Sequence, residues 1–265
     1  MRILLGPAGS PMKSTLEGVS KVRELGLHAM EVQFTHGIKM SLELARQIGS
    51  VRKQEGTELS IHAPYYINLV SKEEKKIEDS KKRILDSCER GHEMGAEKIV
   101  FHPAYFGKFE KEFVANRVVD EIKEMQSFIK KKRWNVKLAP ETTGKHSAFG
   151  SLDEIIWLAQ KTKCSLCVDI AHLYARGNGK IDFHEVFEKL KKIKGHLHFH
   201  FSGIKYSAKG ELSHLVLNGN PSFREFAEVL LDYKRDCTII SESPITWKDS
   251  LKMKKILEEL GYGLK

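Results

Sequence analysis

Short apolar runs alternate with longer amphipathic segments along the whole chain. The first two runs, 3–6 and 29–33, are each followed by a segment with helical periodicity, at 14–25 and 41–54. Six further runs each end in a polar residue: Glu58 to His62, Lys98 to His102, Lys137 to Glu141, Ser165 to Asp169, His196 to His200 and Thr238 to Glu242. The helical segments that follow them lie near 73–94, 110–132, 152–162, 182–192, 222–233 and 249–260.

This alternation of strands and helices predicts a parallel sheet, and eight strand–helix pairs predict closure into a barrel. No G-x-G-x-x-G motif follows the first run, which speaks against a dinucleotide-binding fold. A length of 265 residues suits one α/β barrel, so we expect a single (β/α)8 TIM-barrel domain over residues 1–265. The carboxyl ends of barrel strands meet at one face, so the six polar strand ends are expected to be neighbours there.

Composition adds information about partners and location. The formal charge of +9 favours an anionic partner, although solvated helices rich in Lys and Glu are common. No apolar stretch reaches the length of about 18 residues that a membrane span needs, and the first apolar run is too short for a secretory signal. We therefore expect a cytoplasmic monomer. Cys164 and Cys167 are spaced like a zinc pair, yet on a strand they would point to opposite faces.

Several cations follow predicted strands and would surround the mouth of the barrel. They are Lys108, Lys145, Arg176, Lys180, Lys205, Lys209 and Lys248. Positive charge at that position favours a substrate that carries phosphate. Of these residues, Lys145 and Lys205 are the predicted substrate contacts.

The polar strand ends have the chemistry of metal ligands. They are His62, His102, Glu141, Asp169, His200 and Glu242. Imidazole and carboxylate together suit borderline divalent ions such as Zn, Mn or Fe. Three carboxylates in one dry pocket would repel one another, and two or more cations would remove that conflict. Ions about 4 Å apart could activate water and clamp a phosphoryl group.

Other polar residues lie just beyond the strand ends. His172 follows Asp169 by three residues, and with Glu211 and His214 from the loop after the seventh strand it could complete an outer site. Tyr65 and Asn68 could orient a substrate. Two other histidines, His196 and His198, are expected to pack in the barrel or support the ligands, and His28, His36, His146 and His184 are expected to lie on the surface or in loops.

These segments resemble the endonuclease IV group of the xylose isomerase-like barrels. The similar segments are His62-Ala-Pro-Tyr-Tyr-Ile-Asn-Leu69, Phe101-His-Pro103, Pro140-Glu-Thr-Thr-Gly144, Cys167-Val-Asp-Ile-Ala-His172, His200-Phe-Ser-Gly203 and Ser241-Glu-Ser-Pro244. They span essentially the whole barrel, and their joint order is the diagnostic feature.

The resemblance implies an enzyme that cuts DNA on the 5′ side of abasic sites with up to three zinc ions. His62 and His102 would hold the first zinc, and Glu141 would bridge it to a second held by Asp169, His200 and Glu242. His172 would hold the third with Glu211 and His214. In this picture Glu141, Glu242 and Asp169 are the catalytic carboxylates, and the partner is DNA that contains abasic sites.

The chain departs from the family pattern in two places. The family has an Asp-x-His pair for the third zinc, where this chain has Glu211-Leu-Ser-His214. The family's basic, glutamine-containing loop after strand two corresponds here only to Gln33-Phe-Thr-His-Gly-Ile-Lys39. Two other functions therefore stay open: a sugar isomerase or epimerase of the same superfamily with one divalent ion, and a noncatalytic DNA-binding protein.

Overall fold

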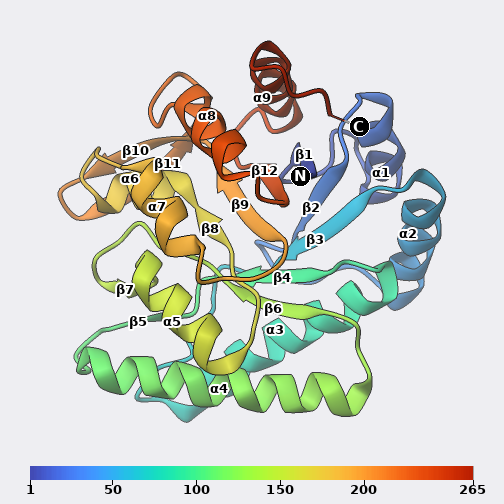
Figure 1. Cartoon of the computed structure of the whole chain (residues 1–265). Coiled ribbons are helices and arrows are strands. Elements are labelled where there is room, and N and C mark those ends of the chain that lie inside the picture. Colours follow the sequence, from blue (N-terminus) through green and yellow to red (C-terminus); the bar gives the residue numbers. More distant parts are fainter. Residues whose placement is uncertain (265) are drawn as a thin grey trace.

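The strands of the computed structural model form a barrel that the helices surround, and residues 1–264 are described (Figure 1). The barrel strands are β1 (Ile3–Pro7), β2 (Ala29–Gln33), β3 (Glu58–His62), β4 (Lys98–Phe101), β6 (Lys137–Pro140), β8 (Val168–Asp169), β9 (Leu197–Phe201) and β12 (Cys237–Ser241). The predicted TIM-barrel fold is confirmed.

Two parallel sheets close into this barrel. Their strand orders are β2-β3-β4-β6 and β1-β12-β9-β8, and bridges from Ala8 to Glu31 and from Glu141 to Cys167 join them. At the first junction the backbones approach closely, since a Cβ added to Gly6 would lie 1.6 Å from the Ala29 carbonyl oxygen. Only glycine therefore fits at that position of β1.

With the exception of α6, the helices lie where amphipathic periodicity predicts them. They are α1 (Thr15–Glu24), α2 (Leu42–Glu55), α3 (Glu74–Met94), α4 (Lys111–Lys132), α5 (Leu152–Thr162), α6 (Ile170–Arg176), α7 (Phe183–Leu190), α8 (Phe223–Tyr233) and α9 (Trp247–Glu259). Ser14 with Glu17, and Ser151 with Glu154, form capping boxes that fix the starts of α1 and α5. Among the described residues, no helix combines the length and the apolar character needed to cross a membrane.

Five elements were not predicted. The short helix α6 follows Asp169 directly, and β5 (Ala104–Tyr105) pairs with β7 (Ala148–Phe149). The segment after β9, expected to be a long loop, instead forms an antiparallel hairpin of β10 (Gly203–Ser207) and β11 (Gly210–Leu215). The predicted strand Ser165–Asp169 is shorter than expected, because only Val168 and Asp169 pair with β9.

The largest apolar core lies between the barrel and its helices, whereas the barrel interior is mostly polar. Inside the barrel, two small apolar clusters interrupt the polar side chains; their members are Leu4, Ala29 and Ile240, and Val100, Ala139 and Cys167. One histidine expected in a loop or on the surface, His28, lies in a loop but is only 8% exposed. Its backbone bonds to both Leu5 and Glu58 and so holds it between strands, whereas His36, His146 and His184 are exposed as predicted.

Candidate metal centre

Glu141 lies at the centre of the polar groups that the strand ends bring together. Its Oε2 atom is 3.0 Å from His102 Nε2 and 3.3 Å from His62 Nε2, and its Oε1 atom is 3.0 Å from His200 Nδ1. Burial by itself would raise the pKa of Glu141, but His102 and His200 hold it well below its usual range. The carboxylate thus stays ionised between imidazoles from three strand ends.

Three overlapping groups of donor atoms surround Glu141, and within each group all atoms lie within 4.8 Å of one another. The groups are His62 with His102 and Glu141; Glu141 with Asp169, His200 and Glu242; and Asp169 with His172 and His214. The first two are the ligand sets predicted for the first and second ions. The third differs from the prediction, because Asp169 takes the place expected for Glu211.

The position of His172 at the mouth of the barrel depends on Asp169. It caps α6, and its Oδ1 atom accepts a hydrogen bond of 2.6 Å from the His172 backbone N–H. This cap turns the chain immediately after β8, so that the His172 ring lies 5.3 Å from the His102 ring. The predicted D-x-x-H pair is therefore a capped helix start with both side chains buried.

The hairpin β10–β11 brings the remaining two predicted ligands to the centre. His214 Nε2 is 3.7 Å from Glu242 Oε2, and Glu211 Oε2 is 3.9 Å from His172 Nε2. The approach is tight at Gly144, where an added Cβ would lie 2.0 Å from Glu211 Oε2. Glu211 therefore lies beside the third group and could join it through a modest movement of its side chain.

In three of the imidazoles, the Nδ1 atom contacts a neighbouring oxygen on the side of the ring that faces away from the centre. His62 Nδ1 donates to the Ala63 carbonyl at 2.7 Å, His172 Nδ1 donates to the Thr142 carbonyl at 2.9 Å, and His214 Nδ1 is 2.7 Å from Ser202 Oγ. With Nδ1 occupied, each neutral ring presents the lone pair of Nε2 to the centre. Such support is typical of metal-binding histidines.

Two observations test whether cations fit this centre. Asp169 Oδ2 and Glu211 Oε2 are buried and have no hydrogen-bond partner among the described residues. Burial raises the pKa of Asp169, and His172 and His214 offset that only in part. The donor set is imidazole and carboxylate throughout, so both the chemistry and the unpartnered oxygens fit divalent ions.

When the histidines are protonated, their positive charge balances the negative charge of the carboxylates. Burial lowers the pKa of His62, but the hydrogen bond and charge of Glu141 outweigh burial and raise it to about 9. Burial is likewise outweighed at His172, where Asp169 and Glu141 raise the pKa to about 9. Divalent ions would replace these protons, and metal binding would release them.

The predicted substrate residues lie at the rim, where some side chains are exposed and others are held by hydrogen bonds. The Tyr65 ring is 5.7 Å from the His62 ring and is 54% exposed, and Lys205 is exposed on β10. Lys145 Nζ is 4.0 Å from Glu211 Oε1. The side-chain oxygen of Asn68 accepts hydrogen bonds from the backbone of Val70 and Tyr105, so Asn68 fastens the loop. Arg176 donates to the carbonyls of residues 143, 145 and 148 and is likewise engaged in loop structure.

Sequence reasoning missed Glu31 and Ser202. Glu31 lies in the middle of β2, is fully buried, and is 3.0 Å from His200 Nε2. A signal was present, because Glu31 is a charged residue in an otherwise apolar run and shares its inward parity with Ala29 and Gln33. Ser202, which contacts His214, carries no comparable signal in the sequence.

Comparison with known proteins identifies the family of this fold. A family model described as xylose isomerase-like TIM barrel matches residues 19–260. An uncharacterised protein of Methanocaldococcus jannaschii is 35% identical, with 97% of this chain and 98% of that protein aligned. An apurinic-apyrimidinic endonuclease of Caenorhabditis elegans is 30% identical over 51% of this chain, and the chain spans only 34% of its length.

Solved structures show the same architecture. Endonuclease IV from Thermus thermophilus superposes with a TM-score of 0.75 at 20% identity, over 98% of this chain and all of that one. A D-tagatose 3-epimerase-like protein superposes with a TM-score of 0.72 at 23% identity, over 98% and 96% of the two chains. At these identities the superpositions establish the fold alone. Together with the family model, they show that the chain belongs to the xylose isomerase-like TIM barrel family, as its resemblance to endonuclease IV indicated.

Proposed function

We propose that this protein is a zinc-dependent endonuclease that hydrolyses the phosphodiester on the 5′ side of abasic sites in DNA. The observation that carries the proposal is the set of three donor groups joined through Glu141 and Asp169. One group would suffice for a single ion, whereas three overlapping groups suit several ions acting on one phosphate. Manganese or iron would fit the same donors.

The ligand side chains and the metal ions would have different roles. His62, His102, His172, His200 and His214 would hold the ions with Glu141, Asp169, Glu242 and Glu211. When bound, the ions would supply Lewis-acid polarisation of the phosphate and activation of water. Without them, the buried carboxylates would repel a phosphodiester, so substrate binding itself would depend on metal.

The exposed side chains at the rim of the barrel support the proposal of a polymeric substrate. Large exposed apolar side chains occur in the segments that follow β1, β3 and β4 and on or next to the hairpin, and they are Met12, Tyr65, Tyr66, Tyr105, Leu212 and Val216. Exposed lysines occur in segments that follow barrel strands, including Lys108, Lys145, Lys205 and Lys209. Aromatic faces beside cations are typical of surfaces on which bases stack and phosphates bind.

The experiment is incision of a labelled duplex with one abasic site, beside an intact duplex, by metal-loaded and chelator-treated protein. Cutting that needs both the lesion and the metal supports the proposal. Folded, metal-loaded protein that leaves the abasic duplex intact contradicts it. Salt-sensitive binding of DNA without cutting would identify a noncatalytic DNA-binding protein instead.

A second candidate is a sugar epimerase or isomerase with one divalent ion. The group of Glu141, Asp169, His200 and Glu242 is by itself a complete four-donor set, and the fold also matches a D-tagatose 3-epimerase-like protein. Metal analysis separates the two functions. A stoichiometry near one ion per chain, with no incision, would favour sugar chemistry.

A further inference from the structure

Glu31 occupies the barrel interior directly beneath the metal centre. Both of its oxygens face His200 Nε2, at 3.0 and 3.2 Å, and Oε2 is also 3.1 Å from His198 Nε2. Ser60 donates a hydrogen bond of 2.8 Å to the same oxygen. An ionised carboxylate in a fully buried position is costly unless donors surround it, and here two imidazoles and a hydroxyl do so.

The ring of His200 is oriented oppositely to those of the other buried ligands. His62 and His172 have Nδ1 bound to a carbonyl, which leaves Nε2 for the centre. In His200, Nε2 faces Glu31, and Nδ1 lies 3.0 Å from Glu141 Oε1 and 3.4 Å from Glu242 Oε2. A carboxylate accepts a hydrogen bond but cannot donate one, so Glu31 keeps the proton of His200 on Nε2 when an ion replaces the proton on Nδ1.

We propose that Glu31 is the positioning residue of the metal centre, and that it makes Nδ1 of His200 the nitrogen that binds the ion shared with Glu141, Asp169 and Glu242. A carboxylate behind a ligating imidazole also raises the basicity of the ring more than a carbonyl does. His200 would therefore be a stronger ligand than His62 or His172. Ser60 contributes by holding the Glu31 carboxylate in place. The inference rests on metal binding at the site of the proposed function, but it does not require that DNA is the substrate.

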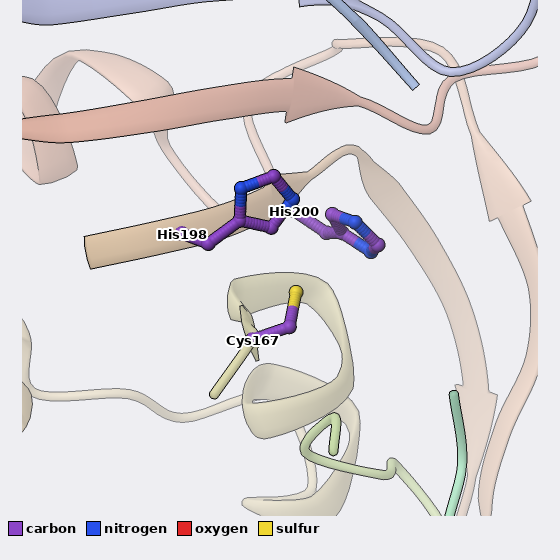
Figure 2. Close-up of side chains that lie close together, drawn as sticks. All are labelled: Cys167, His198 and His200. Carbon is purple, nitrogen blue, oxygen red and sulfur yellow. The ribbon is translucent and has the colours of Figure 1, made fainter. Parts of the chain in front are cut away.

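A different arrangement can be tested against this one. Figure 2 shows the Cys167 thiol directed toward the rings of His198 and His200, and donor atoms of these three residues lie within 4.8 Å of one another. An ion held there would take the thiolate of Cys167 and would use His200 from the opposite side. The sulfur ligand makes the two arrangements spectroscopically distinct.

The test compares wild-type protein with Glu31→Gln, Ser60→Ala and the control Glu121→Gln. Glu121 is also a buried glutamate, but it lies on α4 and pairs with Lys81 and Arg117, away from the centre. Metal affinity is measured by chelator competition, and folding by circular dichroism. We expect Glu31→Gln to weaken the affinity of one ion by about 10- to 100-fold, Ser60→Ala to weaken it less, and Glu121→Gln to leave it unchanged.

Nitrogen-15 spectra of the histidine rings supply a readout that a merely structural role would not change. In metal-loaded wild-type protein, Nδ1 of His200 should carry the signature of the metal-bound nitrogen, and Nε2 that of the protonated one. Wild-type affinity in folded Glu31→Gln protein would overturn the inference. If that variant does not fold, unchanged affinity in Ser60→Ala together with a metal-bound Nε2 in the wild-type protein would overturn it.

Cobalt substitution addresses the alternative arrangement. A near-ultraviolet thiolate-to-cobalt band that disappears in Cys167→Ser would show that the ion lies beside Cys167, and would overturn the assignment of Nδ1. Absence of that band is the expected result. These readouts do not involve DNA, so failure of incision would contradict the proposed function and leave this inference standing.

Discussion

The two ends of the barrel interior are both polar, yet they are organised differently. At the carboxyl end of the strands, imidazoles and carboxylates face one another in groups with donor atoms within 4.8 Å. At the opposite end, a cavity of about 180 Å³ is lined by Lys98, His196, Thr238, Glu58 and Glu97, together with Arg2, Ser60 and His198 and the apolar Leu4, Ala29 and Leu59. Among the described residues, the charged side chains that line this cavity belong to no such group, and of its lining residues only His198 does, with Cys167 and His200.

The difference lies in where the charges find their partners. At the end that contains the cavity, the lower end, the carboxylates form ion pairs with Arg and Lys side chains. Glu58 is 2.6 Å from Arg52, and Glu97 is 2.8 Å from Lys137. At the carboxyl end of the strands, the upper end, Glu141, Asp169 and Glu242 have no lysine or arginine within ion-pair distance among the described residues. They contact histidines instead. A site that must receive cations leaves its carboxylates without fixed ones. At the lower end, fixed cations neutralise Glu58 and Glu97.

Removal of the central carboxylate should have the largest effect. We expect Glu141→Gln to reduce incision of abasic DNA by about 10²-fold or more, because the first and second groups of donors share this residue. Steady-state incision assays measure the loss, and circular dichroism confirms the fold. Glu121→Gln is the matched control and should retain activity. A Glu141→Gln protein with wild-type rates would refute the role of the upper end.

Metal removal should lower stability through the upper end alone. Ligands that bind only the native state stabilise it, by about 2.7 kcal/mol when their concentration is a hundredfold above Kd. For a chain of this size we therefore expect chelation to lower Tm by about 5 °C or more. Differential scanning calorimetry measures the shift. Lys98→Met, at the lower end, should show the same shift as the wild-type protein, and an absent shift in both would contradict metal binding.

Replacement of Lys98 should increase stability. Its side chain is 5% exposed, and its nearest carboxylate oxygen, on Glu97, is 3.6 Å away. Burial also lowers the pKa of Lys98. Because a buried charge without close hydrogen bonds is unfavourable, Lys98→Met should raise the free energy of unfolding by about 1 kcal/mol. Urea unfolding measures it, and a loss of stability would show that the cavity needs the charge.

A further prediction concerns how the stability of the protein depends on pH through His196. Burial and then the charge of Lys98 lower the pKa of His196 to about 4 in the folded protein, whereas an unfolded histidine titrates near 6.5. Between these values the unfolded chain binds more protons, so this residue makes stability fall as the pH drops from about 6.5 to 4. In His196→Gln the decrease in unfolding free energy between pH 7 and pH 5 should be smaller. An unchanged or larger decrease would contradict this assignment.

Much of the site was predictable because barrel geometry is regular. The last residue of six apolar runs became six neighbours at the mouth, as alternation and parallel strands require. Cys164 and Cys167 were expected to point to opposite faces of a strand, and the structure groups Cys167 with His198 and His200. Substrate roles for Tyr65, Asn68, Lys145 and Lys205 remain predictions.

The sequence by itself determined the eight barrel strands, the amphipathic helices between them and the side chains that end the strands, because these follow from periodicity along a few residues. Only the tertiary structure decided which inward side chains meet at the same height in the barrel. The contact between Glu31 and His200 therefore emerged only in the tertiary structure, although the charge of Glu31 within β2 is visible in the sequence. Glu211 and His214 were predicted from the sequence as members of an outer site, but only the tertiary structure showed the hairpin that carries them to the centre.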